Sequence, residues 1–254
     1  MRRRKLIAQG VNHQDSAVAA DYWRIAQWLC NAVLMTSLTT PLYRDESPLL
    51  KALRPAIAML ARAHHHRDRY TCQHQERVAH FAASIGALLG LRRARLEILY
   101  LAALVHDIGK LGIPAEIIGK PGKLSDAEYA IVQTHCAIGH DILQQLHAPF
   151  PIAEIVHQHH ERADGSGYPR RLRGEAILEE ASILAVADTY DAMSSYRPYR
   201  APLSQDFVLG ELRQLAEHVL DPRAVDACIR HVLGGAGVHP AAASIVGSSA
   251  SSST

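Results

Sequence analysis

Residues 104–114 read LVHDIGKLGIP, and they follow a stretch with the apolar spacing of an α-helix. The spacing predicts a helix over 92–107 whose inner face carries Leu96, Leu99, Tyr100 and Ala103. The same face continues into His106 and Asp107, so that a carboxylate ends an apolar stripe. Burying an ionised carboxylate without a partner costs several kcal/mol, and Asp107 therefore needs a cation or a donor beside it.

Other predicted helices repeat this pattern of a polar side chain on an apolar face. The inward residues are His74 in a helix over 71–90, His135 in 125–146, His159 and His160 in 149–161, and Asp188 in 175–195. A single histidine on such a face is more often a core residue bonded to a backbone carbonyl. Five inward histidines together with two inward aspartates favour a shared cation instead.

The number of inward side chains indicates more than one metal ion. Seven nitrogen and oxygen donors exceed the three or four ligands that a single catalytic metal takes from a protein. We therefore predict a pair of divalent ions, with Asp107 as the carboxylate that bridges them. No cysteine lies on these faces. A site of imidazole and carboxylate suits iron, manganese, nickel or zinc better than Cu(I) or an iron–sulfur cluster.

The composition is that of a globular protein: 254 residues, 48% of them hydrophobic, with a formal net charge of +2. This balance argues against a partner that is a nucleic-acid polymer. The sequence shows no apolar run long enough to span a membrane, no signal peptide and no disulfide spacing, so a cytoplasmic location is expected. Its 16 histidines are several times ordinary usage, which directs attention to metal binding.

The alternation typical of strands is scarce, so the predicted fold class is all-α, a helical bundle with the metal site in its core. We divide the chain into a helical segment of unknown role at 1–67, a main domain at 68–235 and a disordered tail at 236–254. We expect the first segment to pack on the domain. The alternatives are pairing with a second copy, which would give a homodimer, and connection to a sensor that this chain does not contain.

An ordered set of motifs resembles the HD-GYP branch of the HD-domain metal-dependent phosphohydrolases. The motifs are Tyr70-Thr71 followed by His74 and Arg77-Val78, LVHDIGKLGIP at 104–114, His135 with Ile138-Gly139, HHERADGSGYP at 159–169, and AVADTYDAMSSYRPYR at 185–200. The resemblance covers roughly residues 68–231. It implies an all-helical fold, two or three metal ions, commonly iron or manganese, and hydrolysis of the bacterial second messenger cyclic di-GMP to pGpG and often on to GMP.

The resemblance assigns the metal ligands to the same side chains as the helical faces do: His74, His106, Asp107, His135, His159, His160 and Asp188. It matches Lys110 with the lysine that follows the His-Asp pair. It places Arg197 and Arg200 at positions that contact the substrate's phosphates or guanines. Tyr70 stands where some members have a further acidic ligand, which favours two metals over three.

In the mechanism that this implies, a metal-activated hydroxide attacks the phosphodiester and Lys110 contacts a non-bridging oxygen; the alternative for Lys110 is an exposed lysine at a helix end. Asp191, one turn after Asp188, is expected to orient a ligand histidine or to accept a proton; the alternative is a plain carboxylate on the helix surface. Gly167 and Tyr168 lie in a turn that either lines the substrate cleft or simply connects two helices. The same turn is a candidate docking surface for a partner protein.

Three functions compete at this point. The leading one is a cyclic di-GMP phosphodiesterase. The second is a hydrolase of another cyclic dinucleotide, such as a mixed one, because the metal chemistry is indifferent to the base. The third is a non-catalytic module that senses the messenger or docks a partner protein, and the complete set of ligands argues against it.

Overall fold

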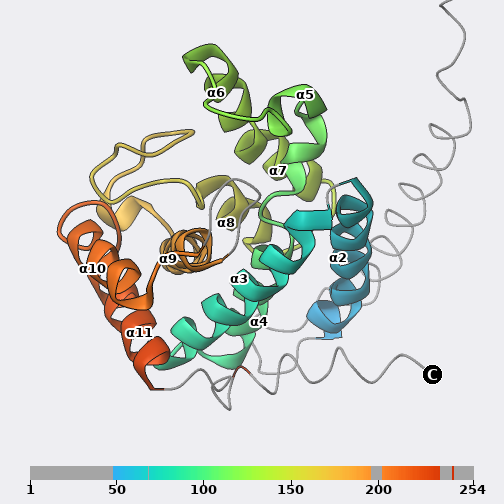
Figure 1. The fold of residues 1–254 in the computed structure, drawn as a ribbon. Helices are drawn as coiled ribbons and strands as arrows, with labels where there is room; N and C mark the ends of the chain where they lie inside the picture. The colour runs from blue at the N-terminus through green and yellow to red at the C-terminus, as the bar shows by residue number, and fades with distance from the viewer. Residues whose placement is uncertain (1–47, 68, 196–201, 235–241, 243–254) are drawn as a thin grey trace, which may run out of the picture. The chain divides into compact units, whose positions relative to one another are not determined.

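The computed structural model describes residues 48–67, 69–195, 202–234 and 242 (Figure 1). These residues form helices and no strand, which confirms the all-α prediction. The elements are α2 (Pro48–Arg67), α3 (Arg69–Leu88), α4 (Arg93–Leu104), η1 (Ile108–Gly112), α5 (Ala115–Ile118), α6 (Asp126–Gln133), α7 (His135–Gln144), α8 (Ile152–Gln158), η2 (Gly174–Ala176), α9 (Glu179–Ser194), α10 (Gln205–Leu215) and α11 (Pro222–Leu233).

Several predictions concern residues outside this part of the chain. They are the substrate contacts of Arg197 and Arg200, the role of the first 47 residues, and the disordered tail. The structure does describe α2, which belongs to the predicted N-terminal segment and packs against α3, α4 and η1. The domain division itself stays a prediction. Among the described helices, none combines the length and the apolar character that a membrane span requires.

Helix α3 is the central element of the bundle. It packs against α4, α9 and α11, while α8 contacts α4, α7 and α9 (Figure 1). The α3 face that begins at His74 is buried along Val78 and Ile85, as the apolar spacing predicts. Gly90, with φ +81°, ends the turn after α3 in a backbone conformation that suits glycine. The inward polar residues of α3, α7 and α9 therefore meet around one core.

Three predicted helices end or break earlier than their apolar spacing indicates, each next to a predicted ligand. Helix α4 ends at Leu104, before His106; α8 ends at Gln158, before His159; and the helix predicted over 125–146 is divided just before His135. In each case the imidazole Nδ1 hydrogen-bonds to the carbonyl three residues earlier. That carbonyl is the one that the next backbone amide would use, so the histidine side chain itself interrupts the helix.

Gly109 sets how closely η1 approaches α7. A Cβ atom added at Gly109 would lie 1.9 Å from the His135 carbonyl oxygen and 2.6 Å from the Gly139 amide nitrogen. Both neighbours are backbone atoms, so they cannot move aside as a flexible side chain would. The absence of a side chain at Gly109 therefore allows the segment that holds Asp107 to lie directly against the first turn of α7.

We predict that Gly109→Ala lowers the free energy of unfolding by about 3 kcal/mol or more, because the added methyl group overlaps the α7 backbone. Gly210→Ala is the matched control: Gly210 lies within α10, and an added Cβ would meet nothing within 4 Å. It should raise stability by about 1 kcal/mol, the helix-propensity gain of alanine over glycine. Urea unfolding of both variants tests this, and a Gly109→Ala protein as stable as the wild type would contradict it.

Candidate metal centre

Three buried histidines are fixed in the same tautomer by backbone carbonyls. The Nδ1 atoms of His106, His135 and His159 lie 2.7, 2.7 and 2.6 Å from the carbonyl oxygens of the residues three positions earlier. A carbonyl only accepts hydrogen bonds, so each Nδ1 carries the proton and donates it. Each neutral ring is left with an unprotonated Nε2 whose lone pair is available to a metal.

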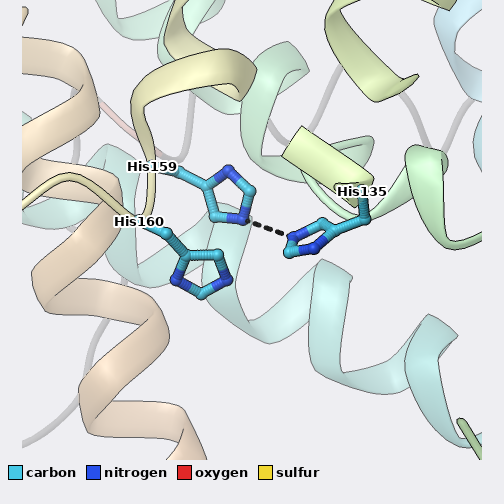
Figure 2. Close-up of side chains that lie close together, drawn as sticks. All are labelled: His135, His159 and His160. Carbon is cyan, nitrogen blue, oxygen red and sulfur yellow. Dashed lines mark hydrogen bonds between the residues drawn. The ribbon is translucent and has the colours of Figure 1, made fainter. Parts of the chain in front are cut away.

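These lone pairs face one another in a buried space. The Nε2 atoms of His135 and His159 are 3.3 Å apart (Figure 2), and His106 Nε2 is buried with no hydrogen-bond partner among the described residues. A hydrogen bond between the two rings in Figure 2 needs one of them to carry a second proton. Burial opposes this and lowers the pKa of both His135 and His159. The donor set therefore fits a cation in this space.

The predicted ligands form two groups, and Asp107 lies close to one histidine of each group. The first group is His74, His106 and Asp188, and the second is His135, His159 and His160; within each, one ligand atom per residue lies within 4.8 Å of the others. Asp107 forms a third such group with His106 of the first and His159 of the second. All seven predicted ligands therefore lie together, and Asp107 has the position expected of a bridging carboxylate.

Asp107 is 2% exposed and remains ionised. Burial acts to raise its pKa, but the ammonium of Lys110 and the imidazoles of His106 and His135 hold the pKa well below its usual range. Lys110 Nζ donates to Asp107 Oδ2 at 2.6 Å. The predicted catalytic lysine thus lies beside the predicted bridging carboxylate, and its side chain is 29% exposed.

His74 is held from both sides by carboxylates of α9. Its Nδ1 lies 2.7 Å from Asp191 Oδ2, and its Nε2 lies 3.2 Å from Asp188 Oδ1. Burial acts to lower the pKa of His74, but the hydrogen bonds to Asp188 and Asp191 outweigh it and raise the pKa to about 9. Asp191 therefore lies behind a ligand histidine, in the orienting position that its spacing from Asp188 suggests.

Arg77 belongs to the first motif of the resemblance, but the sequence analysis assigned it no role in the site. Its guanidinium donates to both oxygens of Asp191, from Nε at 2.6 Å and from Nη2 at 2.9 Å, and Ser195 Oγ donates to Asp191 Oδ1 at 2.9 Å. Arg77 lies three residues after His74 on α3, so it shares the helix face that meets α9. A basic residue at that spacing from an inward histidine was the available signal.

The turn at 164–169 lies beside the second group of ligands. A Cβ at Gly167 would meet the His160 carbonyl oxygen at 2.4 Å, so glycine permits this turn to lie on the backbone of the ligand segment. The Tyr168 ring centroid is 4.8 Å from that of His160, and Tyr129 of α6 lies edge-on to Tyr168 at 6.3 Å. Buried Glu161, also missed from sequence, holds the far end of the turn by accepting from the amides of Arg170 and Leu172.

Cys136 lies closer to the site than its helical position suggested. Its Sγ is 3.6 Å from His135 Nε2 and 3.9 Å from His159 Nδ1. Cys136 follows His135 in the first turn of α7, and its thiol lies between the two imidazoles. Burial raises the pKa of the Cys136 thiol, which disfavours the thiolate form that ligates metals. A ligand set of imidazoles and carboxylates stays the prediction.

Comparison with known proteins identifies the family. A family model described as an HD domain matches residues 55–224, which is more than half of the chain. This chain belongs to the HD domain family, and the domain is of the HD-GYP type. An HD domain binds divalent metal, and the His106-Asp107 pair that joins the two groups of ligands is the motif after which the family is named.

Two curated relatives and one solved structure illustrate the similarity of this HD domain. The cyclic di-GMP phosphodiesterase response regulator RpfG of Xanthomonas campestris is 42% identical over 70% of this chain and 47% of its own length. The 3′3′-cGAMP-specific phosphodiesterase 1 of Vibrio cholerae is 36% identical over 76% of this chain and 45% of its own. The chain thus spans less than half of either relative.

An HDG"Y"P protein from Bdellovibrio bacteriovorus shares the fold, with a TM-score of 0.57 at 16% identity over 84% of this chain and 71% of that protein. At this identity the likeness concerns the arrangement of the helices. It agrees with the all-helical HD domain described above.

We predict that Asp191→Asn weakens the affinity for one of two metal equivalents about 10- to 100-fold. The amide does not neutralise the positive charge of Arg77, and it does not fix the His74 ring as a carboxylate does. The matched control is Asp226→Asn, which removes an exposed carboxylate that pairs with Arg230 on α11. Calorimetric titration of both variants with Mn²⁺ measures the effect. Two unchanged equivalents in Asp191→Asn would show that this carboxylate does not position His74.

Proposed function

We propose that this HD-GYP domain is a metal-dependent phosphodiesterase that hydrolyses cyclic di-GMP to pGpG and on to GMP. The observation that carries the proposal is the position of Asp107 between two groups of metal ligands. The match to RpfG, a cyclic di-GMP phosphodiesterase, supports this substrate. Phosphodiester cleavage is a reaction for which paired metal sites are well suited.

We assign one ion to His74, His106 and Asp188 and a second to His135, His159 and His160, with Asp107 shared between them. When bound, such ions neutralise phosphodiester oxygens and lower the pKa of water so that it can attack phosphorus. We propose iron or manganese, with nickel or zinc as alternatives, because the donors are imidazole and carboxylate.

The chain's own residues contribute charge and orientation around this centre. Lys110 keeps Asp107 ionised, and its partly exposed ammonium is the group that we assign to a phosphate oxygen of the substrate. Asp191 and Arg77 hold His74 in place, so we count Asp191 as a positioning residue. We assign Tyr168 to contact with a base, Gly167 to the close approach of that turn, and Arg197 and Arg200 to the substrate's phosphates or guanines.

Further parts of the proposal concern the setting of the domain. We propose a cytoplasmic location, where a cyclic dinucleotide messenger is available. We propose that residues 1–67 pack on the domain, with homodimer formation as the alternative. The turn at 164–169 is proposed as a contact for partner proteins.

The second candidate is hydrolysis of a mixed cyclic dinucleotide. It is favoured by the similarity to a 3′3′-cGAMP-specific phosphodiesterase. The phosphodiester chemistry is the same for both substrates, so the preference depends on the contacts to the bases.

The test is to incubate the purified protein with Mn²⁺ or Fe²⁺ under reducing conditions with each dinucleotide and to resolve the products chromatographically. We expect cyclic di-GMP to be converted to pGpG and GMP. Asp107→Asn should reduce turnover about 10³-fold or more together with bound metal, whereas the exposed control Asp126→Asn should retain both. Absence of turnover of either dinucleotide in metal-loaded protein would favour the sensing module.

We predict that the ring of Tyr168, rather than its hydroxyl, contributes to substrate binding. Tyr168→Phe should leave KM within about twofold, and Tyr168→Leu should raise it about tenfold or more, because stacking on a base contributes about 1–3 kcal/mol. Steady-state kinetics on cyclic di-GMP distinguishes the two variants. An equal rise of KM in both would assign the effect to the hydroxyl instead, and no rise in either would remove Tyr168 from the substrate contacts.

A further inference from the structure

A second cluster of metal-ligand side chains lies apart from the centre described above. It consists of His140 on α7 with Glu154 and His157 on α8, and one ligand atom from each lies within 4.8 Å of the others. All three side chains are half-buried. None of them belongs to the two groups around Asp107, and the proposed function uses none of them.

Glu154 is oriented so that one carboxylate oxygen is committed and the other faces the cluster. Its Oε1 accepts a hydrogen bond from Gln158 Nε2 at 2.6 Å and another from Arg170 Nη2. Its Oε2 lies 3.7 Å from His140 Nε2, beyond hydrogen-bonding distance. The carboxylate is thus held in place by its neighbours while Oε2 is directed toward an imidazole nitrogen.

The two imidazoles of the cluster are also held in place. The rings of His140 and His157 stack with centroids 4.4 Å apart and an interplanar angle of 28°. His140 Nδ1 lies 3.4 Å from Asp141 Oδ1, an arrangement that leaves its Nε2 toward Glu154. His157 Nδ1 is buried and has no hydrogen-bond partner among the described residues. A buried nitrogen without a partner is costly unless something else satisfies it.

We propose that His140, Glu154 and His157 form an accessory binding site for a divalent transition metal, of which Zn²⁺ is the probe of choice. Two imidazoles and one carboxylate are a ligand set that zinc accepts, with water completing the coordination. The carboxylate of Asp141 behind His140 is the kind of outer partner that fixes a ligand histidine. A cavity of about 440 Å³ has His140 and Glu154 in its wall and provides a path for the ion.

The accessory site would connect two helices that the main centre depends on. Helix α7 begins with His135, and α8 is followed directly by His159 and His160, the second group of ligands. A metal ion held by His140 of α7 and by Glu154 and His157 of α8 cross-links the two helices. It therefore stabilises the packing that places His135 opposite His159, without sharing a ligand with that group.

The guanidinium of Arg170 is the charge that opposes cation binding here. It contacts Oε1 of Glu154, whereas the other oxygen, Oε2, faces His140. We therefore expect the accessory site to bind zinc more weakly than the main centre, and the measurement must be made at equilibrium with free metal.

The test is equilibrium dialysis of the full chain against Zn²⁺, followed by elemental analysis of bound zinc. We expect the wild type to bind one zinc equivalent more than Glu154→Gln and His140→Gln. His147→Asn is the matched control, because His147 is exposed, borders the same cavity and lies outside the cluster. It should bind as much zinc as the wild type. Equal zinc in the wild type and in both cluster variants would overturn the proposal.

A second measurement separates this site from the main centre. In an Asp107→Asn background, which impairs the main centre, added Zn²⁺ should still raise Tm, and combination with Glu154→Gln should reduce that rise. A zinc-induced rise in the double variant equal to that in Asp107→Asn alone would also overturn the proposal. The outcome is independent of cyclic di-GMP turnover, so failure of the accessory site and failure of the proposed function can be told apart.

Discussion

The buried lone pairs of His106, His135 and His159 are the constraint on which the rest of the structure depends. Each ring donates Nδ1–H to the carbonyl three residues earlier, and each presents its unprotonated Nε2 to the same space. Neutral rings in this arrangement cannot hydrogen-bond to one another through Nε2, because each Nε2 carries only a lone pair. The ends of α4 and α8 and the start of α7 follow from these side-chain bonds, and Gly109 allows the segments to approach.

The charges around this space are arranged unequally between the two groups of ligands. The first group contains Asp188, and the hydrogen bonds of His74 to Asp188 and Asp191 outweigh burial and raise the pKa of His74 to about 9. In the second group burial dominates and lowers the pKa of His160 to about 3. Asp107 supplies the negative charge that the second group otherwise lacks. Its ionisation, maintained by Lys110, is therefore central to the proposed pair of ions.

The sequence predicts the helical faces well because burial imposes a period that can be read from apolar side chains. His74, His135 and His159 lie on those faces and are buried as expected. Both interpretations of an inward histidine also prove compatible: His135 bonds a backbone carbonyl through Nδ1 and faces the other ligands through Nε2. The described helices confirm the all-helical fold, and the match of the HD-domain model to residues 55–224 confirms the family.

What the sequence could not supply are contacts between segments far apart in the chain. The bond from Arg77 to Asp191 spans 114 positions, and Glu161 holds the turn at 164–169 through amides that no side-chain pattern reveals. The closeness of Cys136 Sγ to His159, 23 positions along the chain, is a further contact that helical spacing does not reveal.

The most direct test of the account is to locate the metal ions themselves. Anomalous diffraction from crystals grown with Mn²⁺, with data measured on either side of the manganese absorption edge, would show the ions without reference to activity. We expect two anomalous peaks at the main centre, one at His74, His106 and Asp188 and one at His135, His159 and His160, with Asp107 contacting both. A single peak there, or two peaks with Asp107 contacting only one, would contradict it.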